Sequence, residues 1–233
     1  MAFIYRQVMN ALYYLCVWTM KALLVILCRW RVYGQDNLPK EGPVLIVSNH
    51  MNFIDPPLLS SSLHRKLTFM AKKELFQSWM SRPIVQAFSF PVSRGVPNKE
   101  SLRLAALTLE KGRPLAMFPE GKRSPNAQLI EGFPGSSLIA LRAGVPILPI
   151  GITGSEKLKN FFHVFRHLHI TVNIGKPFML PKADSVPRKE QLIEATDMIM
   201  NRIAELLPPE YKGVYLRNGS DHQEVLVGDT ASL

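Results

Sequence analysis

One histidine of this sequence stands five residues before a carboxylate, in the stretch Asn49-His50-Met51-Asn52-Phe53-Ile54-Asp55. On a regular helix, two residues at this spacing lie about 140° apart and their side chains cannot bond. Asp55 precedes Pro56 and Pro57, however, which disfavours a helical conformation at Asp55 and makes it a natural N-cap for the helix that follows. A loop can then fold back and place the carboxylate against the imidazole. In that geometry the carboxylate fixes the tautomer of His50 and stabilises its imidazolium, so the pair can act as a general base.

The spacing by itself leaves a simpler interpretation open. Asp55 would only cap a helix and His50 would only end a strand, because a histidine followed by an aspartate is a common combination. What surrounds the pair must decide between the two interpretations.

The elements that must position this pair alternate between short apolar runs and stretches with helical periodicity. Strands are expected at 43–48, 88–92, 114–118, 145–152 and 168–174, and helices from residue 56 and at 99–111, 136–142 and 189–207. This alternation predicts an α/β fold with a largely parallel central sheet flanked by helices. The strands are apolar with little alternation, which is typical of a sheet covered on both faces.

Polar clusters follow three of the predicted strands at their carboxyl ends, which is the edge where open α/β sheets bind ligands. These clusters are Asn49-His50, Ser93-Arg94, and Glu120 with Lys122-Arg123. A histidine, a carboxylate partner and several cations at one edge predict base chemistry on a substrate that carries a phosphate.

The N-terminal segment is apolar and predicted to be helical, with Lys21 as the single charge in residues 8–28. Its polar side chains fall on one stripe of a helix, namely Arg6, Gln7, Asn10, Tyr14 and Lys21. Such a stripe favours a helix that lies in the membrane interface, with a single membrane span or a soluble core helix as alternatives. We therefore expect a membrane-anchoring helical segment at 1–33, a catalytic domain at 34–212 and a polar C-terminal tail at 213–233.

Composition narrows the class of partner. With 28 Lys and Arg against 18 Asp and Glu, the net charge of +10 attracts polyanions. No nucleic-acid-binding module is recognisable, so lipid is favoured and nucleic acid is not expected. Cys16 and Cys28 lie far from the polar clusters, and no GxSxG elbow is present, which disfavours a nucleophilic cysteine or serine. His163 and His167 are four residues apart but have no acidic neighbour, so no metal site is expected.

Several blocks of the sequence carry a resemblance to a known family. Asn49-His50-x4-Asp55 followed by Pro-Pro resembles the HX4D motif of the glycerolipid acyltransferases, the family of the lysophosphatidic acid acyltransferases. Four further stretches are similar to the Lys-rich stretch and to the second, third and fourth blocks of that family, at 72–75, 90–95, 118–124 and 145–150. The blocks follow the order of the family and span about residues 34–180, which makes the resemblance specific.

The resemblance implies transfer of a fatty acyl group from acyl-CoA or acyl-carrier protein to the sn-2 hydroxyl of 1-acylglycerol 3-phosphate, which yields phosphatidic acid. His50 would be the general base, Asp55 would orient it, and neither an acyl-enzyme nor a cofactor or metal would be required. The implied substrate-binding residues are Asn49, Lys72, Arg94, Glu120, Gly121, Lys122, Arg123 and Pro146. The implied location is the cytoplasmic face of a membrane, by monotopic or single-span anchoring.

Among these residues, the cations Arg94, Lys122 and Arg123 would hold the phosphate of the acceptor. Glu120 would position the glycerol or brace the cations, and Gly121 would let the backbone approach the ligand. Pro146 would line the thioester end.

Phe88, Lys122 and the segment 133–135 depart from the usual pattern of the family, which leaves the acceptor open. One alternative is an acyltransferase for another lysophospholipid or for an aminoacyl lipid. A second alternative is a non-catalytic protein that keeps the fold and binds anionic lipid. The full set of cations favours a bare phosphate monoester.

Overall fold

The computed structural model describes residues 1–79, 81–92, 99–158, 168–181 and 186–216. Its helices are α1 (Ala2–Leu27), α2 (Asp55–Ser62), α3 (Arg82–Phe88), α4 (Lys99–Glu110), α5 (Gly135–Ala143) and α6 (Lys189–Ala204). Its strands are β1 (Arg29–Tyr33), β2 (Val44–Ser48), β3 (Thr68–Lys72), β4 (Ser89–Val92), β5 (Pro114–Met117), β6 (Ile147–Thr153) and β7 (His169–Ile174). Short 3-10 turns include η1 (Gln35–Asn37), η2 (Lys73–Phe76), η3 (Ser155–Lys157), η5 (Pro209–Tyr211) and η6 (Gly213–Tyr215).

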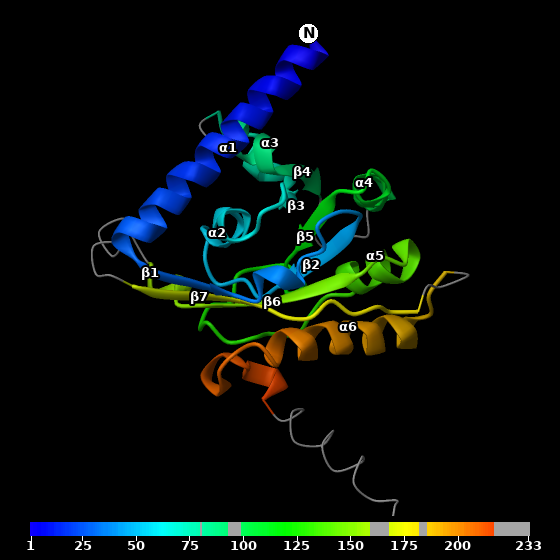
Figure 1. Cartoon of the computed structure of the whole chain (residues 1–233). Coiled ribbons are helices and arrows are strands. Elements are labelled where there is room, and N and C mark those ends of the chain that lie inside the picture. Colours follow the sequence, from blue (N-terminus) through cyan, green and yellow to red (C-terminus); the bar gives the residue numbers. More distant parts are fainter. Residues whose placement is uncertain (80, 93–98, 159–167, 182–185, 217–233) are drawn as a thin grey trace, which may run out of the picture.

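The strands form one sheet in the order β1-β7-β6-β2-β5-β3-β4. Every neighbouring pair is parallel except β6 and β7, which are antiparallel. The predicted α/β fold with a largely parallel central sheet, flanked by helices and preceded by an apolar N-terminal helix, is confirmed (Figure 1).

Both faces of the sheet are covered, because successive side chains of a strand point to opposite faces. In β2, Val44 and Ile46 pack with α1, α2 and α3, whereas Leu45 and Val47 pack with α4, α5 and α6. All five residues of β2 are buried. This is why the strand is apolar, and why the loop with His50 that follows it starts from a rigid position.

Three elements were not expected from the sequence. The strand β1 lies at the edge of the sheet, where exposed Arg29 and Arg31 alternate with half-buried residues. In the sequence, these two arginines after an apolar segment indicate the charged flank of a membrane anchor and not a strand. The strand β3 ends in the polar residue Lys72, and α3 is only seven residues long. Each is too short or too mixed in polarity for its period to be visible.

The folded domain extends beyond the predicted boundaries of 34 and 212 at both ends. Residues 29–33 pair with β7 in the sheet instead of belonging to the helical segment. At the other end, η6 buries Tyr215 in the core formed with α4, α5 and α6. The predicted tail beyond residue 216 lies outside the described residues.

The helix α1 is long and apolar enough to cross a membrane. It docks on the domain through Tyr13 and Leu24, which are buried, and the hydroxyl of Tyr13 accepts a hydrogen bond from the N–H of Leu67 at 3.0 Å. Only 11% of its most apolar window is buried. Most of the apolar surface of α1 therefore faces outward.

Candidate active site

The loop that carries His50 begins at Asn49, whose side chain bonds to the neighbouring strand β6. Beyond the end of β2, the amide of Asn49 donates to the carbonyl oxygen of Ile152 at 2.9 Å and accepts from the N–H of Ile152 at 2.7 Å. Asn49 thus continues the pairing of β2 with β6 by one more position. Its side chain is buried and bonded to β6 in both directions, so it positions the loop that carries His50.

His50 and Asp55 meet as the spacing and the two prolines predict. The Nδ1 atom of His50 lies 2.8 Å from Oδ2 of Asp55. The same oxygen accepts the N–H groups of Met51 and Asn52, each at 2.7 Å. Asp55 is fully buried, and its Oδ1 accepts no hydrogen bond from any described residue. The carboxylate therefore organises the whole loop as well as the imidazole.

The prediction that Asp55 caps the following helix is wrong in its detail. Asp55 is the first helical residue of α2, and Ile54 is the N-cap. Pro56 and Pro57 have no N–H to offer a capping side chain. The carboxylate bonds instead to N–H groups of the loop that precedes the helix.

The Nδ1 edge of the His50 ring faces the buried carboxylate of Asp55, and Nε2 lies on the other edge of the ring. The ring is 12% exposed and stacks on Phe118, with 4.1 Å between the centroids and 18° between the planes. With Nδ1 turned to the carboxylate, a neutral ring carries its proton on Nδ1 and leaves the Nε2 lone pair free. This is the protonation state that a general base requires.

The loop after β5 holds the backbone of His50 from two sides. The Oε1 atom of Glu120 accepts the N–H of His50 at 2.9 Å, and the N–H of Ser124 donates to the carbonyl oxygen of His50 at 2.7 Å. The other carboxylate oxygen of Glu120 accepts the N–H of Ile130 at 3.4 Å. No ion pair joins Glu120 to a cation among the described residues, and its carboxylate contacts the His50 loop directly.

Glu120 is buried completely. Burial raises the pKa of its carboxyl group to about 7, although the N–H groups of His50 and Ile130 lower it, and the negative charge of Asp55 raises it further. The charge of this buried carboxyl group, which contacts the backbone of His50, therefore depends on pH near neutrality.

Gly121 is required by the turn itself. Its φ of +63° is a left-handed conformation, and a Cβ atom at this position would lie 3.1 Å from the ring of Phe133. Lys122 and Arg123 follow this turn and are exposed, and neither forms an ion pair within the described part of the chain. The turn therefore presents two free cations next to the loop of His50.

Lys72 reaches the same edge of the sheet. Phe69 pairs with Ala116, which pairs with Ile46, so Lys72 and Asn49 each lie three residues beyond this aligned row. Lys72 is exposed, and its Nζ lies 3.6 Å from a carboxylate oxygen of Glu74. Arg94, like His163 and His167, lies outside the described residues.

Pro146 is not brought to the site. Leu45 pairs with Ile147, which places Pro146 level with Val44 at the amino end of the sheet. At a rise of about 3.3 Å per residue, the distance from this level to His50 is roughly 20 Å. The structure therefore does not bring Pro146 together with the other predicted site residues.

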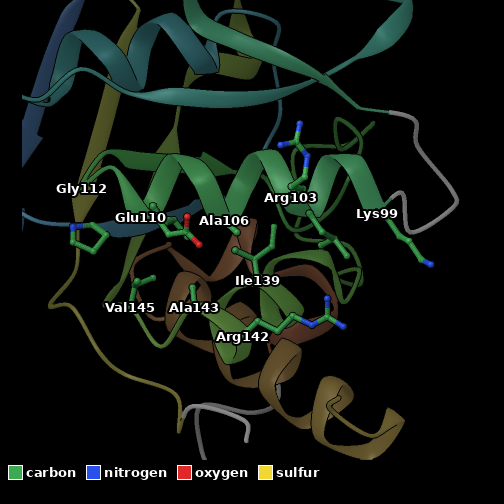
Figure 2. A pocket seen from close by; sticks show the side chains of 12 residues that line it. Lys99, Arg103, Ala106, Glu110, Gly112, Ile139, Arg142, Ala143 and Val145 are labelled. Atoms are coloured by element: carbon green, nitrogen blue, oxygen red, sulfur yellow. The ribbon is translucent and has the colours of Figure 1, made fainter. Parts of the chain in front are cut away.

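A cavity of about 640 Å³ lies at that same amino end, between α4 and α5 (Figure 2). Pro43, Gly112 and Val145 line it, and they precede β2, β5 and β6 respectively. The cavity is therefore at the opposite end of the strands from His50. His50 and Asp55 instead lie at the carboxyl edge of the sheet.

Sequence reasoning missed the two residues that pack or pin the loop. Phe118 stacks on the imidazole, and the amide of Asn52 donates to the carbonyl oxygens of Ser155 and Leu158 at 2.8 and 3.0 Å. Asn52 stands inside the motif, where a polar residue that is buried calls for hydrogen-bond partners. Nothing in the sequence indicates which carbonyl groups those partners are.

Comparisons with known proteins agree with this geometry. The family described as Acyltransferase matches residues 29–153. The chain is 28% identical over 197 residues to the 1-acyl-sn-glycerol-3-phosphate acyltransferase of Bacillus subtilis, across 84% of this chain and 96% of that protein. It is 30% identical over 193 residues to the protein of that name from Streptococcus pneumoniae, across 77% of this chain and 67% of that protein.

The fold is similar to a solved structure. The 1-acyl-sn-glycerophosphate (LPA) acyltransferase PlsC from Thermotoga maritima superposes with a TM-score of 0.63 at 23% sequence identity, covering 85% of this chain and 78% of that chain.

Proposed function

The chain belongs to the acyltransferase family, and from this membership we propose that it transfers a fatty acyl group from an acyl thioester to the sn-2 hydroxyl of 1-acylglycerol 3-phosphate, which yields phosphatidic acid. The observation that carries the mechanism is the 2.8 Å contact of His50 Nδ1 with a buried carboxylate that is held by two further N–H donors. The names of the relatives support the acceptor.

In the proposed reaction, Nε2 of His50 removes the proton of the acceptor hydroxyl, and Asp55 stabilises the imidazolium that forms. The alkoxide oxygen attacks the thioester carbonyl, and the carbon–sulfur bond breaks as the ester bond forms. The imidazolium returns its proton to the departing thiolate. The histidine is thereby regenerated, and no covalent acyl-enzyme is needed.

We propose that Lys122, Arg123 and Lys72 bind the phosphate of the acceptor, together with Arg94. A phosphate monoester carries up to two negative charges, so it gains from several cations at one edge. Glu120 and Asn49 are proposed as positioning residues. Glu120 contacts the backbone of His50, and Asn49 ties the start of the His50 loop to β6. Gly121 is proposed to shape the turn that presents the cations.

The helix α1 supports a membrane location, since acceptor and product are both lipids. We place the catalytic edge on the cytoplasmic side, where acyl-CoA and acyl-carrier protein are found. Both donors are compatible with an edge that is open to solvent.

The test is an assay of purified protein with both thioester donors over a range of chain lengths and with a panel of acceptors. We expect 1-acylglycerol 3-phosphate to be preferred over lysophospholipids with a headgroup and over aminoacyl lipids. Equal use of all acceptors would overturn the proposed acceptor.

The variant His50→Ala separates an enzyme from a lipid-binding protein. We expect it to lose turnover while it still binds acceptor-containing vesicles. Vesicle binding by a wild-type protein that shows no turnover with any donor would support the non-catalytic alternative.

A further inference from the structure

The connection from β3 to α3 exposes large apolar side chains that no described residue covers. Trp79 is 83% exposed, Ile84 is 49% exposed and Leu75 is 47% exposed. Exposed apolar groups that gather in one segment mark a surface that contacts a partner or a membrane. We refer to residues 73–84, apart from residue 80, as the β3–α3 corner.

The corner adjoins the exposed surface of α1. The helix α3 packs against the N-terminal half of α1, as Figure 1 shows, and the hydroxyl of Tyr5 donates to the side-chain oxygen of Gln86 at 3.1 Å. Phe3 and Ile4, which lie on the same part of α1, are 65% and 67% exposed. The apolar surface of the anchor helix therefore continues onto the folded domain.

The charges of the corner complement an anionic bilayer. Lys73 and Arg82 are exposed within it, and Lys72, which precedes it, pairs with Glu74, the only carboxylate of the segment. Tryptophan is typical of headgroup depth, and basic residues are attracted to an anionic leaflet. The continuity of this surface with the outward-facing apolar side of α1 favours a bilayer over an acidic protein partner.

The corner also lies at the catalytic edge. It follows directly on Lys72, which register places three residues beyond the same aligned row as Asn49. Contact of the corner with a bilayer therefore brings the edge that carries His50 toward the lipid phase.

We propose that the β3–α3 corner is a second membrane-contacting surface, which enters the headgroup region of an anionic bilayer beside α1 and turns the catalytic edge toward the membrane. The contact itself follows from exposure, charge and position. Its use in presenting the lipid acceptor rests on the proposed function.

Fluorescence of Trp79 tests the contact directly. The protein has three tryptophans, so Trp18→Phe with Trp30→Phe leaves Trp79 as the only reporter. With equimolar phosphatidylcholine and phosphatidylglycerol vesicles, we expect its emission to shift to the blue and to be quenched by lipids brominated near the headgroup. Unchanged emission, in a protein that sediments with the vesicles through α1, would overturn the proposal.

Activity tests the consequence. We expect Leu75→Ser with Trp79→Ser to reduce turnover of an acceptor embedded in vesicles by about tenfold or more, since two apolar anchors are lost. Turnover of a short-chain, water-soluble acceptor should stay within about twofold. The control is Ile193→Ser, because Ile193 is 51% exposed on α6, on the other face of the sheet.

The other outcomes are distinguishable. Equal loss with both acceptors, or loss with neither, would contradict the membrane role of the corner. A second copy of the chain as the occupant would appear as self-association that the double variant abolishes, with no vesicle-dependent shift. A wild-type protein that acylates neither acceptor would refute the proposed function, while the fluorescence of Trp79 would still decide the contact.

Discussion

Replacing Glu120 by glutamine keeps the volume of the side chain and removes a buried titratable group that contacts the backbone of His50. In the folded protein the carboxyl group has a pKa of about 7, raised from 4.5 chiefly by burial. A raised carboxyl pKa means that the folded state binds the proton more tightly than the unfolded state does. The folded protein is therefore favoured at low pH, and this contribution is lost as the pH rises from about 4.5 to about 7.

The difference between the two pKa values corresponds to about 3 kcal/mol of stability between pH 4.5 and pH 8. Glu120→Gln does not titrate, so it should lack this loss. We therefore expect the free energy of unfolding of the variant minus that of wild type to increase by a few kcal/mol from pH 5 to pH 8. Chemical unfolding of both proteins across this range measures the effect.

A matched control is Glu131→Gln, which removes an exposed charge from the same loop. Its stability should follow that of wild type at every pH. Parallel curves for wild type and Glu120→Gln would refute the assignment of a raised pKa to a buried Glu120.

Catalysis by Glu120→Ala separates a positioning role from a substrate-binding role. The change leaves the part-buried N–H groups of His50 and Ile130 without their acceptor, at about 1 kcal/mol for each group. We expect kcat to fall by about 10²-fold through misplacement of His50, with little change in KM for the acceptor. A raised KM with unchanged kcat would instead indicate that Glu120 contacts the glycerol.

Three further outcomes follow from the site. Asp55→Asn should lower kcat by about 10³-fold or more, because the amide cannot stabilise the imidazolium; steady-state kinetics at pH 8 measure this. Asn49→Ala should lower the free energy of unfolding by about 1–3 kcal/mol, because the buried N–H and carbonyl groups of Ile152 lose their partners, and urea titration measures this. Lys122→Ala with Arg123→Ala should raise KM for a phosphate acceptor by about tenfold or more and leave KM for the thioester unchanged, in assays at low and high salt.

Controls for these variants lie on the surface away from the catalytic edge. Asp36→Asn, in η1, removes a carboxylate without touching the His50 loop, and Lys111→Ala removes an exposed cation after α4. Near-normal kinetics of Asp55→Asn would contradict the base assignment. An unchanged KM in the double cation variant would contradict the phosphate site.

The elements predicted correctly from the sequence are those in which the hydrophobic pattern runs without interruption. The strand β2 is five apolar or small residues in a row, and the two prolines after Asp55 mark the start of α2. In the edge strand β1, arginines alternate with apolar residues, and the same pattern is typical of the charged flank of a membrane anchor. Only its pairing with β7 shows that the segment is a strand. Tertiary contact decides such segments because their local preference is weak.

The site divides in the same way. His50 and Asp55 are visible in sequence because their chemistry depends on side-chain type and on a short spacing. The contact of Glu120 with the N–H of His50 is not visible, since it joins a side chain to a backbone group 70 positions away. A glutamate at this edge could equally bind a cation or a hydroxyl group. Only the structure, in which Glu120 is buried against the His50 loop, shows which contact it makes.

The fourth block of the resemblance shows how a motif can matter without touching the substrate. Pro146 lies near the start of this block, at the far end of the sheet, yet the strand that the block forms runs beside β2 toward the His50 loop. Two residues beyond the block, the backbone of Ile152 forms two hydrogen bonds with the side-chain amide of Asn49, at 2.7 and 2.9 Å. A shift of β6 by one residue would turn its side chains to the other face and would break this pair. The block therefore acts on His50 through the register of two buried strands, which is why apolar residues that pack well, instead of polar residues, fill it.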